Sequence, residues 1–323
     1  MAFLVLMNLF EFKILSSLLF FYFLIIFFYK MNFSNFTISG YSTALFSTWF
    51  FVEELGLLFD AGDGITATLL QKSRKIKHVF ISHADRDHLT GLFQFNQLNA
   101  RKGLPIIHYP ADSGSFRAIA DFTKRFDPHV GGTVWQPIKE EEEFEIKPKI
   151  FVRSIRNNHV IAPAEMTKSL SFQVFTKTPK LKAEFQHLPK TEIKDLAIAK
   201  GQDFITNTVT ANILGYSGDT PVDDYEHWNN TKILIHEATF LDNNEKLNNH
   251  ANKHSTLEEV IKMVSEIKVE KLILSHFSSR YSKIEIDAAI RKFCKMYRVD
   301  IPVYRILPGE ACLDILGGEM VNG

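Results

Sequence analysis

Two apolar runs that each end in metal-binding residue types constrain this sequence more than any other feature. The runs lie at 79–81 and 272–274, and the polar residues that follow them include His83, Asp85, Asp87, His88 and His276. A buried strand is rich in aliphatic residues, and the loop just past it is where imidazoles and carboxylates can converge without being buried unpaired. The sequence therefore predicts a metal site built at strand ends.

The composition is that of an ordinary folded protein, with 46% hydrophobic and 23% charged residues. The 37 basic and 37 acidic side chains cancel, so there is no overall attraction to nucleic acid, although a local basic patch is still allowed. The two cysteines, Cys294 and Cys312, are too few for a disulfide framework and do not suggest a thiolate metal site. A reducing compartment is the simplest expectation.

The N-terminal segment differs in composition from the rest and predicts a division into residues 1–30 and a hydrolase domain at 31–323. Residues 14–29 are uncharged and almost wholly apolar, and at helical rise they fall slightly short of the roughly 30 Å bilayer core. No small-residue cleavage site follows them, which argues against a removed signal peptide. Two alternatives stay open: a membrane anchor, or upstream sequence with translation starting at Met31, which would make the protein cytoplasmic.

After Met31 the pattern alternates between strands and helices, without repeats or low-complexity linkers. Strands are expected at 36–40, 45–52, 55–60, 78–82, 106–109, 149–155, 170–175, 209–216, 233–235, 271–274 and 303–306. Helices are expected from Gly64 toward Lys72 and at 88–100, 115–125, 256–267 and 283–297. Grouped strands interleaved with helices predict two mixed β-sheets packed face to face and covered by helices, an αββα sandwich.

Six short motifs, in order along 33–316, resemble the metallo-β-lactamase superfamily and its ribonuclease Z branch. They lie at 58–64, 82–88, 215–220, 234–240, 254–256 and 275–281. Each motif alone is weak, but their shared order and spacing make the resemblance specific. The resemblance implies the αββα fold and a metal-dependent hydrolase.

The resemblance also implies two divalent metal ions that share one carboxylate. His83, Asp85, His159 and Asp219 would hold one ion, and Asp87, His88, Asp219 and His276 the other. Asp85 stands where the family usually has a second histidine. Zinc is the expected metal, and the harder carboxylate ligand shifts the preference toward manganese or iron without excluding zinc.

The catalytic residues implied by the resemblance are Asp87, Glu237 and His254. Asp87 would hold metal and orient a metal-bridging hydroxide that attacks phosphorus. Glu237 would orient His254, which would protonate the leaving alkoxide, because an oxygen leaving group needs a proton donor with a pKa near neutrality. The alternative is structural: His254 would begin the following helix, and Glu237 would be a strand-end charge.

The implied activity is that of a dinuclear phosphodiesterase, with tRNA 3′ processing as a candidate reaction, RNA as a candidate partner and a homodimer as the expected assembly. Long ribonuclease Z enzymes carry a basic arm rich in glycine and proline. At the corresponding place this chain has four lysines within 177–190 but no glycine-rich stretch, and a charge-balanced surface helix is the alternative. Other open readings are a small-molecule or cyclic-nucleotide phosphodiesterase, an iron-dependent oxidoreductase, and a non-catalytic, membrane-tethered binding protein.

Overall fold

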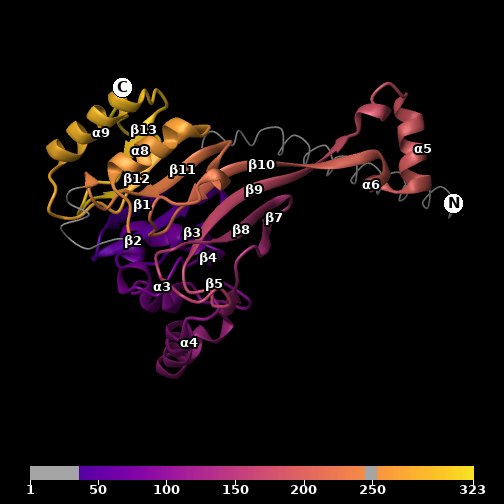
Figure 1. The fold of residues 1–323 in the computed structure, drawn as a ribbon. Coiled ribbons are helices and arrows are strands. Elements are labelled where there is room, and N and C mark those ends of the chain that lie inside the picture. The colour runs from indigo at the N-terminus through magenta and orange to yellow at the C-terminus, as the bar shows by residue number, and fades with distance from the viewer. Residues whose placement is uncertain (1–35, 244–252) are drawn as a thin grey trace, which may run out of the picture. The chain divides into compact units, whose positions relative to one another are not determined.

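Two seven-stranded sheets form the centre of the molecule (Figure 1). The structure is a computed structural model and describes residues 36–243 and 253–323. The first sheet has the order β14 (Ala311–Cys312), β1 (Ile38–Thr43), β2 (Ser47–Val52), β3 (Leu57–Phe59), β4 (His78–Phe80), β5 (Ile106–Pro110) and β6 (Val134–Ile138). The second has the order β13 (Val303–Arg305), β12 (Val269–Ser275), β11 (Thr231–Glu237), β10 (Thr206–Tyr216), β9 (Leu170–Leu181), β8 (Ile150–Arg156) and β7 (Glu143–Lys147).

Aromatic rings from the two sheets interdigitate between them. Phe59 of β3 lies 5.9 Å from Phe172 and 4.9 Å from Tyr216, ring centre to ring centre. Phe80 of β4 meets Phe172 edge to face at 5.2 Å. These side chains are almost completely buried, and burial of such large rings is a dominant source of folding free energy.

Helices cover the outer face of each sheet and complete the predicted αββα sandwich. They are α2 (Ile65–Leu69), α3 (Leu92–Asn99), α4 (Gly114–Phe126), α8 (Leu257–Glu266) and α9 (Lys283–Tyr297), whereas α5 (Lys190–Lys200) and α6 (Gln202–Ile205) lie away from the sandwich. Apolar residues of α8 and α9 pack on β11 and β12, whereas α2, α3 and α4 pack on the first sheet. The last two helices begin at capping boxes, Thr256 with Glu259 and Ser282 with Glu285, which satisfy backbone N–H groups that a helix start leaves free.

Parallel pairing brings the carboxyl ends of several strands to one rim of the sandwich. Strands β3 to β6 pair in parallel in the first sheet, and β10 to β13 pair in parallel in the second. Loops that follow such strands meet at one edge, which is where sites in sheets of this kind are built. The two motifs that begin with apolar runs follow β4 and β12, so the topology brings them to the same rim.

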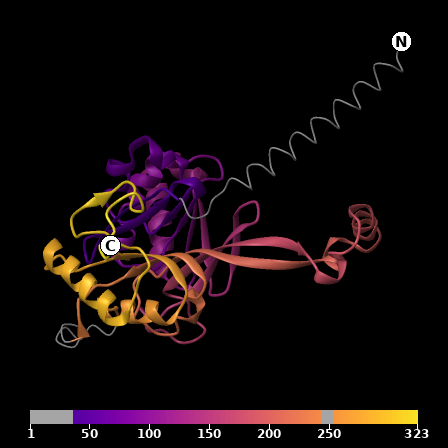
Figure 2. The ribbon, with the colours of Figure 1, turned by 90° about the horizontal axis from the view of Figure 1, so that it is seen from above.

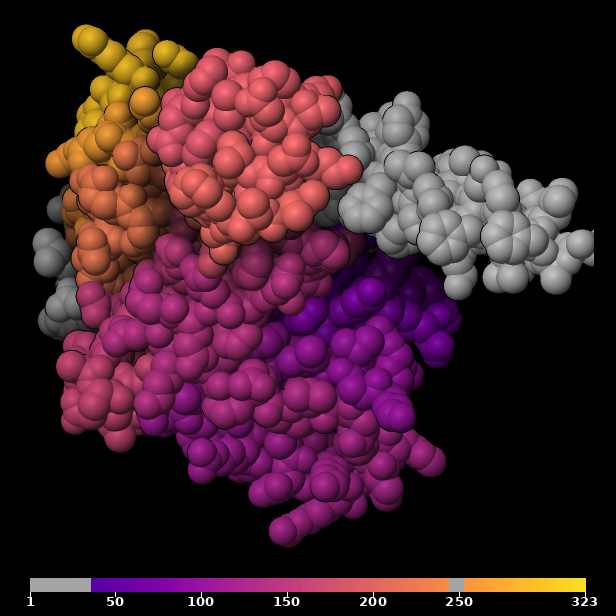
Figure 3. Space-filling view, turned by 90° about the vertical axis from the view of Figure 1, so that its right-hand side faces the viewer, coloured from indigo at the N-terminus to yellow at the C-terminus, as the bar shows by residue number. Residues whose placement is uncertain are grey.

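An arm projects from the second sheet, formed by the far halves of β9 and β10 (Figures 1 and 2). The two strands stay paired from Thr206 with Leu181 to Tyr216 with Phe172, and α5 and α6 stand at the tip. Figure 3 looks along the arm and shows its tip as a compact lobe. The predicted strands at 170–175 and 209–216 were too short, because 176–181 and 206–211 pair outside the core and carry polar residues.

The helix predicted at 88–100 was also wrong at its start. A 3-10 turn, Arg86–His88, comes first, and α3 begins only at Leu92. The break falls at Gly91, where an added Cβ would lie 2.0 Å from the carbonyl oxygen of Gly62. Strands β6, β7 and β14 were missed, since they lie at sheet edges and lack a continuous apolar run.

The predicted N-terminal segment and its boundary at residue 30 lie outside the described residues and stay predictions. Among residues 36–243 and 253–323, no helix combines the length and the apolar character that a membrane crossing requires.

A pair of histidines in the interior predicts how stability depends on pH. Burial lowers the pKa of His78 to about 4 and of His108 to about 3, from an ordinary 6.5. Nδ1 of His78 lies 3.3 Å from Nε2 of His108, whose ring stacks on Phe80 at 4.0 Å. Because the unfolded chain binds these protons more strongly, stability should be lost as the pH falls from about 6.5 toward 4.

Replacing His108 with Phe should flatten this loss, since Phe can occupy the aromatic setting and does not titrate. We expect the unfolding free energy of the variant to decline less between pH 7 and pH 4, by on the order of 2–3 kcal/mol. Denaturant titrations at both pH values measure it. Equal declines in the two proteins would show that His108 does not carry this acid sensitivity.

Candidate metal centre

The residues predicted as metal ligands meet at the rim between the sheets. His83 and Asp85 follow β4, while Asp87 and His88 lie in the turn Arg86–His88. His159 follows β8, Asp219 follows β10 and His276 follows β12. Donor atoms of these seven residues form three groups within 4.8 Å: His83, His88 and Asp219; His83, Asp85 and His159; and Asp87, His88 and His276. Two further groups include His254, one with His159 and Asp219 and one with Glu237 and His276.

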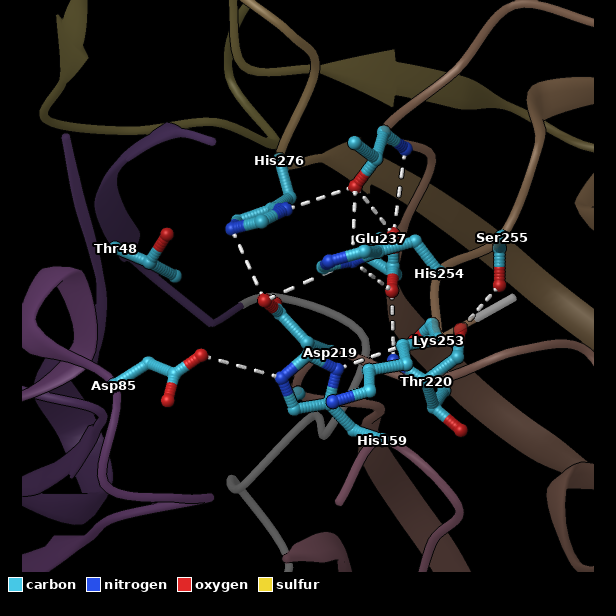
Figure 4. Close-up of polar contacts among 12 residues, drawn as sticks. Thr48, Asp85, His159, Asp219, Thr220, Glu237, Lys253, His254, Ser255 and His276 are labelled. Atoms are coloured by element: carbon cyan, nitrogen blue, oxygen red, sulfur yellow. Dashed lines mark hydrogen bonds and ion pairs between the residues drawn. The ribbon is translucent and has the colours of Figure 1, made fainter. Parts of the chain in front are cut away.

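Asp219 lies at the centre of this cluster (Figure 4). Its Oδ2 atom is 3.3 Å from Nε2 of both His88 and His276, and 3.9 Å from Nε2 of His83. Burial alone would raise the pKa of Asp219, but the imidazoles of His276 and His88 hold it well below its usual range. A buried carboxylate among three imidazoles can reach two adjacent cations at once.

The tautomers of these histidines follow from their outward hydrogen bonds. Nδ1 of His88 donates to Asp60 at 2.7 Å, and Nδ1 of His159 donates to the carbonyl oxygen of Lys253 at 3.1 Å. Nδ1 of His83 lies 2.9 Å from Ser82 Oγ. That hydroxyl already donates to Asp60, so it accepts from His83.

The same reasoning holds for His276, whose Nδ1 lies 2.9 Å from Thr239 Oγ1. Thr239 donates its hydroxyl proton to Glu237 at 2.6 Å and therefore accepts from His276. All four imidazoles thus use Nδ1 as donor and leave the Nε2 lone pair for the centre of the cluster.

Three of these Nε2 atoms, on His83, His88 and His276, are buried and have no hydrogen-bond partner among the described residues. A buried polar atom without a partner is unfavourable by about 1–3 kcal/mol, and three at one point call for a common ligand. Burial lowers the pKa of His88, yet the carboxylates of Asp219 and Asp60 raise it well above the ordinary value. Imidazoles that direct Nε2 to one point, together with three carboxylates, fit divalent cations.

Asp85 is the least buried of the seven, with 62% of its side chain exposed. Its Oδ2 atom lies 3.4 Å from Nε2 of His159 and 3.6 Å from Nε2 of His83. The neighbouring imidazoles of His159 and then His83 lower its pKa, so it is present as a carboxylate. The cluster therefore keeps a donor at this position, and the ligand roles of the seven residues stay predictions.

The predicted acid–base pair lies beside the cluster. Nδ1 of His254 is 3.0 Å from Oε1 of Glu237 and 3.8 Å from Oδ2 of Asp219. Burial lowers the pKa of His254, but Glu237 and Asp219 outweigh it and raise the pKa to about 9. The backbone N–H of Thr220, at 2.7 Å, helps to hold the Glu237 carboxylate in place.

Comparisons with known proteins agree with this geometry. A family model described as the beta-lactamase superfamily domain matches residues 57–200. The chain is 28% identical to chloroplastic tRNase Z TRZ2 of Arabidopsis thaliana, over 80% of this chain and 72% of that protein. It is 26% identical to tRNase Z TRZ1 of the same plant, over 80% and 91% of the two chains.

A solved structure shares the fold, that of the metallo-beta-lactamase fold protein YhfI of Bacillus subtilis. The two structures superpose with a TM-score of 0.58 over 86% of this chain and 99% of that one, and their sequences are 15% identical. These comparisons support a protein of the metallo-β-lactamase superfamily type. Its relatives include ribonuclease Z proteins, and it is a metal-dependent hydrolase.

Asp60, Ser82, Tyr216 and Thr239 hold the predicted ligands in place through hydrogen bonds, and the sequence did not reveal these roles. Asp60 accepts hydrogen bonds from the backbone N–H of Ser82 at 2.6 Å, from His88 and from the Tyr216 hydroxyl. Its left-handed backbone, with φ of 51°, aims the carboxylate inward. Asp60, Ser82, Tyr216 and Thr239 lie within recognised motifs, but their contacts depend on the tertiary fold.

Replacing Asp60 with Asn should weaken metal binding without removing a ligand. The amide offers His88 a weaker acceptor and disturbs its tautomer, and loss of such outer partners typically lowers metal affinity 10–100-fold. Competition with a chromophoric chelator measures the affinity. Asp287→Asn is the matched control, because Asp287 is also buried but pairs with Arg305 at 2.8 Å instead. Equal metal affinity in Asp60→Asn and wild type would contradict the role of Asp60.

Proposed function

We propose that this metal-dependent phosphodiesterase uses two metal ions to hydrolyse RNA, with tRNA 3′ processing as its reaction. The observation that carries the proposal is the Glu237–His254 pair, placed 3.0 Å apart beside the cluster of buried imidazoles. Hydrolysis of an RNA phosphodiester expels an alkoxide, which needs a proton donor. Hydrolysis of a substrate with a better leaving group does not need a proton donor.

Two divalent cations bound by the seven residues would activate water and neutralise charge on the phosphodiester. Three of those residues, Asp85, Asp87 and Asp219, are carboxylates, and the other four are imidazoles, which would bind as neutral ligands. Two dications would therefore leave one net positive charge, which attracts an anionic substrate. Zinc is the metal we propose, with manganese or iron favoured to the extent that Asp85 binds directly.

His254 would carry the proton for the leaving oxygen. With a pKa of about 9 it is protonated at neutral pH, and Nδ1 is engaged by Glu237. Its side chain is 21% exposed, whereas that of Glu237 is 1% exposed, so the imidazole and not the carboxylate can meet substrate. Asp87 would hold metal and orient the attacking water, since its Oδ2 atom lies 3.5 Å from Nε2 of His276.

RNA is proposed as the substrate for two reasons. Curated relatives over most of the chain's length are named tRNase Z or Ribonuclease Z. The arm also carries exposed lysines toward its tip, at 180, 190, 194 and 200, partly balanced by Glu192, Asp195 and Asp203. Lysines on a projecting ribbon can neutralise phosphates far from the cleaved bond. A homodimer stays a prediction.

Replacing His254 with Ala should lower turnover on RNA by roughly 10²–10⁴-fold with metal content intact. The loss should shrink on bis(p-nitrophenyl) phosphate, whose leaving group needs no proton. Asp87→Ala should abolish hydrolysis of both substrates, and His129→Ala, at an exposed remote histidine, should change neither rate. A His254→Ala enzyme that cleaves RNA at the wild-type rate would remove His254 from the mechanism.

Removing charge from the arm should weaken RNA binding and its salt dependence. We expect the Lys180→Ala/Lys194→Ala double variant to raise KM for precursor tRNA several-fold and to flatten the slope of log KM against log salt by about one to two units. Lys262→Ala/Lys292→Ala on α8 and α9 is the matched control. Identical salt slopes in the two double variants would exclude the arm as an RNA contact.

A further inference from the structure

The turn between β1 and β2 is fixed to the metal centre by its backbone. The N–H of Leu45 donates to Oδ2 of Asp87 at 3.1 Å. The N–H of Ala44 donates to the carbonyl oxygen of Phe277, the neighbour of His276, at 3.2 Å. Figure 4 shows Thr48 of β2 beside the same site. The turn is therefore part of the rim around the metal ligands.

Two large apolar side chains stand exposed on this anchored turn. Leu45 is 88% exposed and Phe46 is 63% exposed. Single exposed apolar residues are ordinary on a protein surface, but adjacent ones on a turn bonded to a metal ligand are not explained by packing. Because they are exposed, these two side chains add little to the free energy of folding.

Leu45 also occupies a backbone conformation that suits other residues better. Its φ is 71°, in the left-handed region where Gly, Asn and Asp are favoured and where a branched side chain is strained. A residue that is both exposed and strained contributes nothing to the core. Such strain at the edge of a functional site points to a role in binding.

We propose that Leu45 and Phe46 form an apolar platform that receives a nucleobase next to the cleaved phosphodiester. The inference rests on the proposed function, in which the substrate is RNA. A phosphodiester at the metal ligands places its flanking nucleotides within reach of the rim, and Asp87 joins the rim to the platform directly. Every base has an apolar face that stacks on an aromatic ring, so the contact would be tolerant of sequence.

The test compares two precursor tRNAs that differ only in the bases beside the cleavage position. One is unmodified, and the other carries an abasic nucleotide on each side. We expect Phe46→Ala to raise KM about 5- to 100-fold on the unmodified RNA, with kcat changing less, and to have little effect on the abasic RNA. Phe46→Trp should restore KM. Ile284→Ala, at a remote side chain that is 80% exposed, is the control.

Leu45→Asn separates binding from stability, because Asn accepts the left-handed backbone and keeps the N–H that Asp87 uses. We expect a melting temperature at or above that of the wild type, together with a raised KM on the unmodified RNA. Equal KM penalties on both RNAs, or loss of stability and metal together, would overturn the platform, since the turn would then act on the metal centre. If the wild type cleaves neither RNA, the proposed function fails and the platform fails with it.

Discussion

The buried carboxylate of Asp60 is the contact on which the metal centre depends. It accepts hydrogen bonds from the backbone and hydroxyl of Ser82 and from His88, which lie in the segment that follows β4 of the first sheet, and from the hydroxyl of Tyr216 in β10 of the second. An isolated buried charge would be unfavourable by several kcal/mol, so these donors must be in place together. One side chain thus joins the sheets at the rim and fixes the tautomer of a metal ligand.

Hydroxyl groups hold two further imidazoles of the site in place. The Ser82 hydroxyl accepts a hydrogen bond from His83. The Thr239 hydroxyl donates to Glu237 and accepts from His276. These hydrogen bonds therefore orient the imidazoles with Nε2 toward the centre of the cluster. Glu237 also engages His254. One network of hydrogen bonds, around Asp60, therefore holds His83 and His88, and a second, around Glu237, holds His276 and the proposed proton donor His254.

The sequence predicted the fold and the grouping of the proposed ligands better than it predicted the residues that hold those ligands in place. The fold class and family are confirmed, since apolar runs and ordered motifs are local signals. The arm's length was underestimated, because strands that pair away from the core show no apolar alternation. The hydrogen bond from Tyr216 to Asp60 joins residues that are 156 positions apart, and no sequence spacing predicts such a contact. The break before α3 depends on Gly91 meeting Gly62, which is likewise a property of packing.

The central claim is that seven side chains, with Asp219 at their centre, hold two divalent cations. Metal content per chain, measured by mass spectrometry after reconstitution with zinc and removal of unbound metal, tests it most directly. The account predicts two equivalents for the wild type and at most one for Asp219→Ala, with circular dichroism showing both proteins folded. One equivalent or none in the wild type, or two in Asp219→Ala, would contradict it.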